Sequence, residues 1–409
     1  MTADPTSGFK QALDTVLPAG QVLTAAIDRL AYANDASVYR LVPKGVARPN
    51  NVDEVKRLFR FSHEHRVPIT FRAAGTSLSG QAVTDGILVD AARHWRSVEV
   101  LDDGEAVRFQ PGVIAAAVNR ALAPYQKKIG PDPASINACM MGGVLANNSS
   151  GMCCGVELNA YHTLDSMVFV LPNGMTIDSA AHDCEERFLA EAPHLAGGLL
   201  ELRDRVRADT NLCGRIRHKY LMKNTMGYSL NAFLDYDAPV AMLSHLMVGS
   251  EGTLGFIAEA VLRTIPDYPL KHTGMLFFDD VPSACSAIVP LRDSGARTLE
   301  LMDHASLISV QHQPGVPQRI PDLPPTAAAL LVEYQASTEG ELSDFLTSCD
   351  EVMPALSLQS DPIFTRDPVR QDNLWSVRKG LIASVGAERK RGTSMIIEDV
   401  VFPLEALAE

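Results

Sequence analysis

The chain has 409 residues, 46% of them hydrophobic and 21% charged, a balance typical of a globular protein long enough for about two or three domains. Its formal net charge of −13 argues against nucleic-acid binding, although small anionic ligands respond to local fields and are not excluded. No apolar run reaches the roughly 18 to 20 residues of a transmembrane helix, and the N-terminus lacks the pattern of a secretory signal.

Seven cysteines are scattered along the chain without a CxxC motif. An odd, scattered set favours reduced thiols over a disulfide framework or a metal cluster. We therefore expect a cytoplasmic protein, with peripheral attachment at the inner membrane as an alternative. The adjacent Cys153 and Cys154 fit packing better than the lining of a ligand site.

The N-terminal part begins with a predicted helical lead-in over residues 1–36, followed by strand, loop, strand and loop over 37–51. Asn51 is a good N-cap, and Glu54 three residues later completes a capping-box pattern. The helix that starts there has apolar residues on one face, namely Val52, Val55, Leu58 and Phe59. It leads into a predicted strand at 67–71.

Two similar hairpins follow a predicted strand at 87–90. The segment 97–109 carries Asp-Gly in its turn and 166–178 carries Asn-Gly, which are strong hairpin signals between apolar runs. The sequence further predicts the remaining elements in order, namely a helix at 113–122, a loop-rich tract at 129–155, helices and loops at 183–248, and a glycine-rich turn running into a strand at 248–266.

The pattern changes near residue 269, where a second α/β domain is predicted. A strand at 273–278, a helix at 281–294 and a strand at 297–302 form one β-α-β unit. The later elements are a Pro-rich loop at 314–325, a strand at 329–335, helices at 339–350 and 368–386, and a strand at 394–403. Because LEALAE at 404–409 begins a helix that stops at once, we expect the chain to be truncated.

The stretch RAAGTSLSGQ, residues 72–81, follows a predicted strand. Gly75 and Gly80 permit positive φ, and successive backbone N–H groups in such a turn can form a nest for phosphate oxygens. Taken alone, the stretch fits a polar surface turn equally well.

Two further tracts of small residues lie downstream. GPDPASINACMMGGVLANNSSGMCCG, residues 130–155, is a long run of small donors whose entrance is stiffened by Pro131 and Pro133. So long a loop usually has a function. GSEGTLGF, residues 249–256, also reads as a plain turn when taken alone.

The three tracts in this order resemble the FAD-binding domain of the vanillyl-alcohol oxidase, or PCMH, type. The segments KNTMGYSLNAFLDY and HLMVGSEGTLGFIAEA resemble the D-lactate and D-2-hydroxyglutarate dehydrogenase branch, in its long bacterial form with a C-terminal iron–sulfur region. The resemblance runs from about residue 37 to the end. It implies an α+β protein with the FAD-binding domain, built of two α/β subdomains, at 37–268 and a partial α/β cap, or substrate, domain at 269–409.

The resemblance also implies cofactor contacts. The FAD pyrophosphate would lie on the loop formed by Ala74, Gly75, Thr76, Ser77, Leu78, Ser79, Gly80 and Gln81. The flavin side would be followed by Pro131, Asp132, Ala134 and Ser135, and the cofactor would be lined by Gly142, Gly143, Asn147, Ser150 and Gly151. Its far end would meet Glu251, Gly252 and Ile257. Some family members attach FAD through a histidine, but His94 lies beyond the loop, so noncovalent FAD is expected.

The family's substrates are D-2-hydroxy acids, whose carboxylate an arginine fork binds best. VRQDNLWSVRKGL resembles the helix that presents this arginine, which makes Arg378 the first candidate and Lys379 and Arg370 weaker ones. Lys223 and Asn224 are candidates to approach the flavin or the substrate. A solvated helix face remains the alternative for Arg378, and a solvated basic loop is the alternative for Arg215, Arg217, Lys219 and Lys223.

The implied reaction removes the hydroxyl proton with a base and passes the C2 hydride to flavin N5, with electrons then going to an iron–sulfur domain, a quinone or a cytochrome. A family motif like GHxGDGNLH, which carries metal and base histidines, is missing, and so are the iron–sulfur cysteines. Glu398 and Asp399 match the family's strand end, with solvated carboxylates as the alternative. No metal is expected here, because no metal-ligand pattern occurs around His162, His182, His218, His245, His272, His304 and His312.

Two other functions stay open. One is a different PCMH flavoprotein oxidase acting on an alcohol or a sugar, which the missing attachment histidine and the KNTMGY tract weigh against. The other is a non-catalytic FAD-binding fragment.

Overall fold

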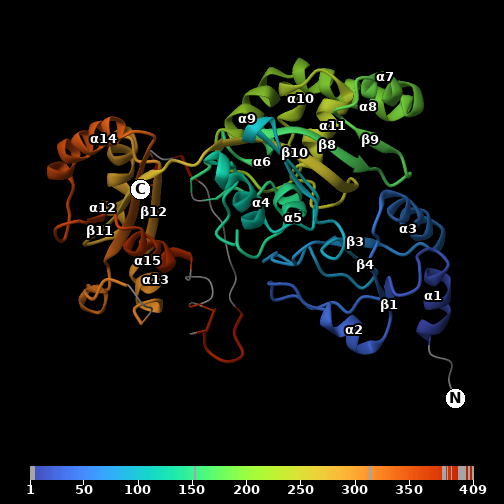
Figure 1. The fold of residues 1–409 in the computed structure, drawn as a ribbon, viewed down its shortest axis with the longest axis horizontal. Helices are drawn as coiled ribbons and strands as arrows, with labels where there is room; N and C mark the ends of the chain where they lie inside the picture. The colour runs from blue at the N-terminus through green and yellow to red at the C-terminus, as the bar shows by residue number, and fades with distance from the viewer. Residues whose placement is uncertain are drawn as a thin grey trace. The chain divides into compact units, whose positions relative to one another are not determined.

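The computed structural model describes residues 5–151, 153–312 and 316–379, together with 384, 386–387, 389–394, 402–403 and 406–407. The chain divides into two compact units, Met1–Pro266 and Asp267–Glu409 (Figure 1). No helix of the described part has both the length and the apolar character needed to span a membrane.

The first sheet of unit 1 has the order β1-β2-β4-β3, with β2, β4 and β3 parallel and β1 antiparallel to β2. Its strands are β1 (Val22–Leu23), β2 (Gly45–Ala47), β3 (Ile69–Arg72) and β4 (Ile87–Asp90), and the accompanying helices are α1 (Pro5–Asp14), α2 (Ala26–Ala31) and α3 (Val52–His65). The helical lead-in expected over residues 1–36 is therefore only partly right. It contains α1 and α2, but β1 between them pairs with β2 in the sheet.

The strand expected between residues 37 and 41 is wrong. This segment makes only an isolated bridge between Asn34 and Arg40, and Val38 and Tyr39 are 55% and 57% exposed. An apolar alternation without a partner strand does not form a ladder.

Helix α3 begins as predicted. The Asn51 side chain accepts a hydrogen bond from the Glu54 N–H at 2.9 Å. The Glu54 carboxylate returns to the N–H of Asn50 at 2.7 Å, one residue earlier than in a standard capping box.

The second sheet of unit 1 has the order β5-β6-β10-β8-β9, and β7 pairs with β10. Its strands are β5 (Val98–Leu101), β6 (Ala106–Phe109), β7 (Lys127–Ile129), β8 (Leu164–Val170), β9 (Thr176–Asp178) and β10 (Phe256–Pro266). Both predicted hairpins are confirmed, as β5–β6 and β8–β9.

The tract expected to be loop at 129–155 contains helix α5 (Met141–Asn147). Met141, Val144 and Leu145 bury the face of this helix, at a spacing of three and four residues that the two glycines conceal in the sequence. The other helices of the unit are α4 (Ala115–Leu122), α6 (Ala160–Thr163), α7 (Cys184–Glu191), α8 (Pro193–Ala208), α9 (Thr210–Tyr220), α10 (Ala232–Asp235) and α11 (Pro239–Met247), with 3₁₀ turns at Asp102–Gly104 and Ala123–Tyr125.

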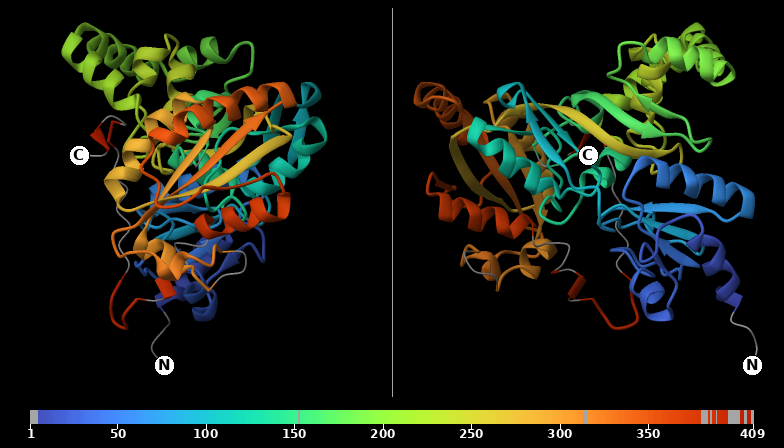
Figure 2. Two further views of the ribbon diagram at one scale, coloured as in Figure 1. Left: turned by 90° about the vertical axis from the view of Figure 1, so that its left-hand side faces the viewer. Right: turned by 45° about the vertical axis from the view of Figure 1, so that its right-hand side comes forward.

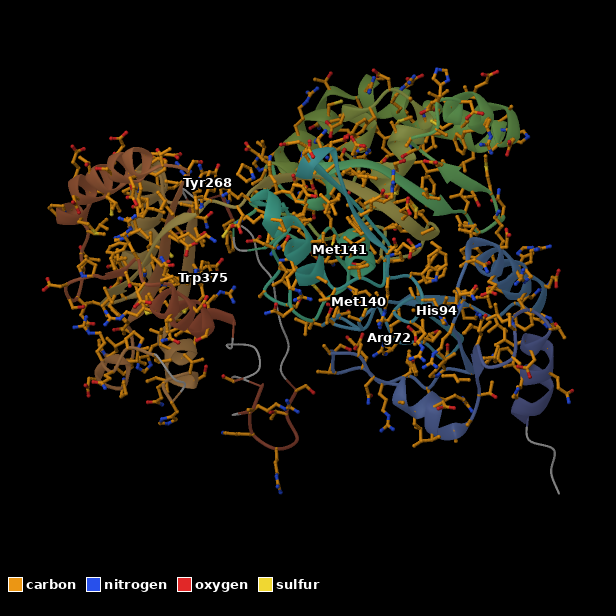
Figure 3. All side chains as sticks on the ribbon, viewed as in Figure 1. Arg72, His94, Met140, Met141, Tyr268 and Trp375 are labelled. Carbon is orange, nitrogen blue, oxygen red and sulfur yellow. The ribbon has the colours of Figure 1, made fainter. Side chains whose placement is uncertain are left out.

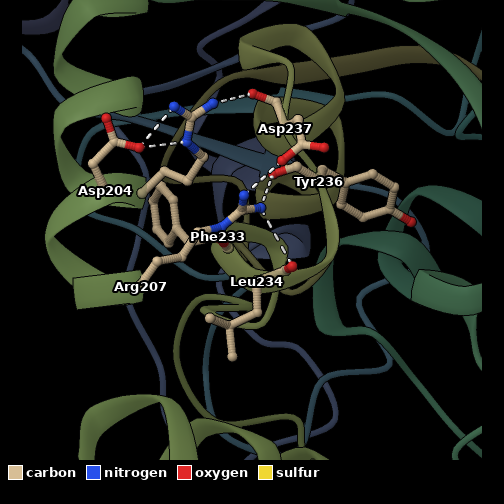
Figure 4. A network of polar contacts seen from close by, with 7 residues as sticks. Asp204, Arg207, Phe233, Leu234, Tyr236 and Asp237 are labelled. Carbon is tan, nitrogen blue, oxygen red and sulfur yellow. Dashed lines mark hydrogen bonds and ion pairs between the residues drawn. The ribbon is translucent and has the colours of Figure 1, made fainter. Parts of the chain in front are cut away.

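Arg207, near the end of α8, forms hydrogen bonds with α10 and with the residues that follow it, up to Asp237 (Figure 4). Its guanidinium donates to the carbonyls of Phe233 and Tyr236, each at 2.8 Å, and to the Asp237 carboxylate at 2.6 Å. These bonds satisfy carbonyl groups that the short helix leaves without intrahelical partners.

Arg207→Ala is expected to lower the free energy of unfolding by about 2 kcal/mol, because several charge-assisted hydrogen bonds to carbonyls are lost together. Arg207→Lys should recover little, since a point charge cannot reach the same set of acceptors. Urea unfolding measures both, and Arg205→Ala on the exposed side of α8 is the control. Equal stability of the Arg207 and Arg205 variants would contradict the proposed role.

His245 on α11 is a buried titratable group in this region, 6% exposed. Its Nδ1 lies 2.9 Å from the Ala241 carbonyl and its Nε2 lies 2.7 Å from the Tyr236 hydroxyl, with the two rings stacked at 3.9 Å. This pattern fits the neutral ring with a proton on Nδ1. Burial lowers the pKa of His245 to about 4, against the opposing effects of the Ala241 carbonyl and Asp235.

The folded protein should therefore lose stability as the pH falls from about 6.5 to about 4. In that window the unfolded chain binds a proton that folded His245 does not, so acid favours unfolding by about 3 kcal/mol in total. The difference in unfolding free energy between pH 7 and pH 4.5 should shrink in His245→Gln and remain in His182→Gln, whose histidine is exposed. An unchanged pH dependence in His245→Gln would refute this assignment.

Unit 2 is built on an antiparallel sheet of order β12-β13-β11-β14. Its strands are β11 (Leu270–Phe278), β12 (Thr298–Asp303), β13 (Ala328–Ala336) and β14 (Ile363–Thr365). Helices α12 (Val281–Asp293) and α14 (Glu339–Val352) pack on one face, and α13 (His304–Ser309) and α15 (Pro368–Lys379) on the other (Figure 2). Short 3₁₀ turns lie at Ile320–Asp322 and Met353–Ala355.

The predicted β-α-β unit has its elements in place, but β13 lies between β11 and β12. Every residue of β13 is buried, as expected of a central strand covered on both faces. The helix expected at 368–386 is described to Lys379. Most of the strand expected at 394–403, including Glu398 and Asp399, lies outside the described residues, and so does the Lys379 side chain.

Candidate functional site

The loop at 72–81 leaves β3 at the carboxyl ends of three parallel strands, which is where ligands bind in open α/β sheets. Gly75 and Gly80 have φ of 72° and 82°. Ser77 Oγ accepts from the N–H groups of Ser79 and Gln81 at 3.2 and 3.3 Å. Within the described residues, the N–H groups from Ala74 to Ser77 have no protein acceptor, so they remain available to an anionic group.

Arg72, which is labelled in Figure 3, packs against this loop, a role that the sequence did not reveal. Its guanidinium donates to the carbonyl of Asn34 at 2.8 Å and lies 5.6 Å from the Tyr32 ring centroid. A Cβ added at Gly75 would stand 2.5 Å from Arg72 Nη2, and the Gly75 carbonyl accepts from the Ala36 N–H at 3.0 Å. The N-terminal segment therefore determines the shape of the loop. The available signal was an arginine at the last residue of the preceding strand.

A second polar cluster lies at the same strand ends. The Tyr32 hydroxyl donates to Asp90 at 2.7 Å, and Arg48 reaches both Asp90 and the Tyr32 oxygen, at 3.2 and 2.7 Å. Asp90 is only 5% exposed, and these two side chains are its hydrogen-bonding and ion-pair partners at the strand ends. Burial, together with the Asp90 carboxylate, raises the pKa of Tyr32 against the opposing effect of Arg48.

The second and third glycine-rich tracts meet at the end of α5. Asn147 Nδ2 donates to the Glu251 carboxylate at 2.7 Å, and the Glu251 N–H donates to the Ala146 carbonyl at 2.8 Å. Glu251 and Gly252 have φ of 51° and 72°, so the turn is tight. Burial raises the pKa of Glu251, and the bond from Asn147 opposes that shift.

The third tract, residues 249–256, also lies beside β3, the strand that precedes the 72–81 loop. A Cβ at Gly252 would be 3.6 Å from the Phe71 ring, and Phe71 contacts Phe256 with 5.0 Å between ring centroids. Ile257, one residue later, is buried in the main core of unit 1, at 7% exposure. The structure therefore joins candidates of the second and third tracts directly and places the third tract beside Phe71, the residue before the first tract, whereas Ile257 serves packing.

Asp132 ties the two ends of the second tract together. Its carboxylate accepts from the N–H groups of Cys153 and Cys154 at 2.9 and 3.2 Å. A Cβ at Gly151 would stand 2.0 Å from the Asp132 carbonyl oxygen, so only glycine fits there. Burial raises the pKa of Asp132 and raises that of Cys154 to about 11.

The remaining candidates of this tract differ in exposure. Pro131 and Ser150 are buried, Ala134 is half-buried, and Ser135 is exposed. A Cβ at Gly142 would meet Pro111 at 2.6 Å, whereas one at Gly143 would meet open space. Gly143 is therefore on an exposed side of α5.

The residues present fit a large polar cofactor. Ser250, in the turn with Glu251, is 2% exposed, and its hydroxyl has no hydrogen-bond partner within the described part of the chain. A buried hydroxyl without a partner is costly unless a further group satisfies it. Together with the free N–H groups of the 72–81 loop, it gives the site donors suited to FAD.

The KNTMGY tract adjoins the same turn. Ser229 Oγ donates to the Val248 carbonyl at 2.8 Å, and the Tyr228 and Thr253 hydroxyls are 2.8 Å apart. Asn224 accepts from the N–H of Met226 at 3.1 Å, and Lys223 is exposed. The basic side chains on α9 are exposed as well, namely Arg215, Arg217 and Lys219.

Arg378 lies on α15 in unit 2 and already has a protein partner. Its Nε donates to the Glu300 carboxylate at 2.6 Å. Arg370, on the same helix, is exposed. In the described residues, no group of three or more His, Cys, Asp or Glu side chains is placed to hold a metal ion.

Residues 43–180 match the family model described as an FAD binding domain, and residues 269–409 match the one described as the C-terminal domain of FAD linked oxidases. The chain is 25% identical over 389 residues to the glycolate oxidase subunit GlcD of Bacillus subtilis, covering 93% of this chain and 69% of that protein. It is 25% identical over 409 residues to the D-2-hydroxyglutarate dehydrogenase of Pantoea ananatis, covering 95% of this chain and 40% of that protein.

Among solved structures, an alkyldihydroxyacetonephosphate synthase superposes with a TM-score of 0.62 at 15% identity, covering 91% of this chain and 65% of the other. This likeness concerns the fold. It confirms the α+β architecture expected from the sequence.

Proposed function

Because the chain belongs to the FAD-linked oxidoreductases that join a PCMH-type FAD-binding domain to an FAD-linked oxidase C-terminal domain, we propose that it oxidises a 2-hydroxy acid to the 2-oxo acid. D-2-hydroxyglutarate and D-lactate are the leading substrates, and the similarity to a glycolate oxidase subunit adds glycolate. The chain spans 40% of the length of its D-2-hydroxyglutarate dehydrogenase relative. The activity of that whole protein is therefore a proposal for this chain.

The observation that carries the proposal is the contact between the second and third glycine-rich tracts in unit 1, with the third tract beside Phe71 at the entry to the first. The 72–81 loop would hold the pyrophosphate by its free N–H groups, with Arg72 fixing the loop from below. Asp132 and Gly151 would keep the second tract closed along the cofactor. Bound FAD supplies a hydride acceptor, and we propose that its binding is noncovalent.

The substrate carboxylate needs a cation, and Arg378 is the proposed one. Its Nη1 and Nη2 atoms have no acceptor in the described part of unit 2. Two parallel N–H bonds from one guanidinium both bind and orient a carboxylate. Lys223 and Asn224 are proposed to line the site, and the electrons are proposed to leave to an iron–sulfur centre or another acceptor.

The test is the visible spectrum of the purified protein, followed by anaerobic addition of each acid. We expect a yellow protein that is bleached by one of D-2-hydroxyglutarate, D-lactate and glycolate, and not by the L-enantiomers of the first two. A colourless protein that takes up no added FAD would refute the proposal.

The same experiment separates the two competing functions. Bleaching by a primary alcohol or a sugar, with fast reoxidation in air, would instead support a flavoprotein oxidase of the same fold. FAD uptake without bleaching by any of these compounds would support a non-catalytic FAD-binding module.

A further inference from the structure

Helix α15 crosses the sheet of unit 2 and bonds to each of its strands through side chains. Gln371 donates to carbonyl groups on β11 and β14, at 2.7 and 3.2 Å. Trp375 Nε1 donates to Glu333 on β13 at 2.6 Å, and Arg378 Nε donates to Glu300 on β12 at 2.6 Å. The helix is thus fixed at three points along its length, the last of which is the candidate substrate arginine.

The contact of Trp375 is with Glu333, a carboxylate whose two oxygens both accept hydrogen bonds. Glu333 is 3% exposed and accepts from the Thr273 hydroxyl, the Gln335 amide and the Trp375 indole, each at 2.6 Å. Both of its oxygens are in use, so it is a poor candidate for the base that removes a substrate proton. It instead fixes the position of Trp375, labelled in Figure 3, which lies three residues before Arg378 on α15.

The contact of Arg378 with Glu300 is different, because it uses only the Nε of the guanidinium. The side chains of Arg378 and Glu300 are 26% and 15% exposed. A guanidinium can offer a carboxylate either its Nε side or its terminal edge with two Nη atoms. Glu300 occupies Nε, so the terminal edge remains for a ligand.

We infer that Glu300 is a positioning residue for substrate: it holds Arg378 by Nε and thereby presents the terminal edge of the guanidinium to the carboxylate of the 2-hydroxy acid. The inference rests on the proposed function. An arginine with its rotamer already fixed loses less entropy on binding than a free one, so the effect of Glu300 falls on affinity.

The test compares Glu300→Ala with Glu300→Gln in the FAD-loaded protein. Glu300→Ala should raise KM for the bleaching substrate roughly tenfold and change kcat less than about twofold, because binding is lost equally from ground and transition states. Glu300→Gln should stay within about threefold of wild type, since its amide oxygen still accepts from Nε. Glu351→Ala, at an exposed glutamate of α14, is the matched control.

Two readouts do not depend on turnover. The Kd of the 2-oxo acid product, measured by calorimetry, should rise in Glu300→Ala in parallel with KM. In a Trp95→Phe background, the emission of Trp375 should be the same with and without the Glu300→Ala change, which shows that the helix stays in place and only the guanidinium is released.

The outcomes separate the two proposals. If Arg378→Ala weakens product binding and Glu300→Ala does not, the positioning role is overturned while the proposed function stands. The positioning role is also overturned if Glu300→Gln is as impaired as Glu300→Ala, or if Arg378→Ala leaves product binding unchanged. Failure of every hydroxy acid to bleach the flavin overturns the proposed function, and calorimetry with the 2-oxo acids still decides whether Glu300 acts through Arg378.

Discussion

Gly75→Ala is expected to weaken FAD binding by roughly a hundredfold. Gly75 has a φ of 72°, which costs an L-residue about 1–2 kcal/mol. The added Cβ would also stand 2.5 Å from Arg72 Nη2, so the guanidinium must leave its bonds to the backbone or the loop must move. Displacing a charge-assisted hydrogen bond costs about 1.5–3 kcal/mol, and the two effects add to about 3 kcal/mol at the proposed pyrophosphate loop.

Gly174→Ala is the matched control. Gly174 has a φ of 86°, but it lies in the β8–β9 turn, and the nearest atom to its added Cβ is 3.9 Å away. It should carry the conformational cost without losing the cofactor. The ratio of flavin to protein absorbance and a fluorescence titration of the apoprotein with FAD measure the effect, and normal FAD affinity in Gly75→Ala would remove this loop from the proposed site.

Arg378→Ala is expected to lower kcat/KM for the hydroxy acid by about 10²- to 10³-fold, because a two-bond ion pair with the carboxylate is worth roughly 3–4 kcal/mol when solvent is excluded. Arg378→Lys should recover only part of the loss, since one ammonium cannot donate to the Glu300 carboxylate and also form two parallel bonds to the substrate carboxylate. The FAD content should not change, because the candidate FAD residues all lie in unit 1.

Arg370→Ala tests the competing arginine on the same helix. Arg370 is exposed, so its removal should leave kcat/KM within about twofold of wild type. Steady-state rates with an artificial electron acceptor measure all three variants. A large loss in Arg370→Ala with none in Arg378→Ala would transfer the proposed role to Arg370.

Local patterns in the sequence predicted much of the fold. The Asn51 cap and the Asp-Gly and Asn-Gly hairpins follow from short-range chemistry, and the structure contains them. The predictions failed where the outcome depended on distant partners. Residues 37–41 alternate like a strand but have no neighbouring strand, and β13 separates β11 from β12 although it comes later in the chain.

The candidate site divides in the same way. The order of the three glycine-rich tracts and the resemblance that it carries can be read from the sequence, because glycines at tight turns and small donors near a cofactor leave a linear pattern. The supporting contacts have no such pattern. The Arg72 guanidinium under Gly75, the Asp132 carboxylate on the Cys153 and Cys154 N–H groups, and the unpartnered Ser250 hydroxyl appear only once the chain is folded.

The sequence by itself determined the family and the cofactor through its resemblance to known flavoproteins, and it supplied the candidate residues of the site, because glycines and small donors keep a recognisable order along the chain. Only the tertiary structure decided which groups are already in use. Arg378 reads as a free cation in the sequence, but folding brings Glu300 to its Nε from 78 residues away. The physical reason is that an ion pair or a hydrogen bond depends on distance in space. The fold of unit 2 sets that distance by bringing Glu300 on β12 to Arg378 on α15.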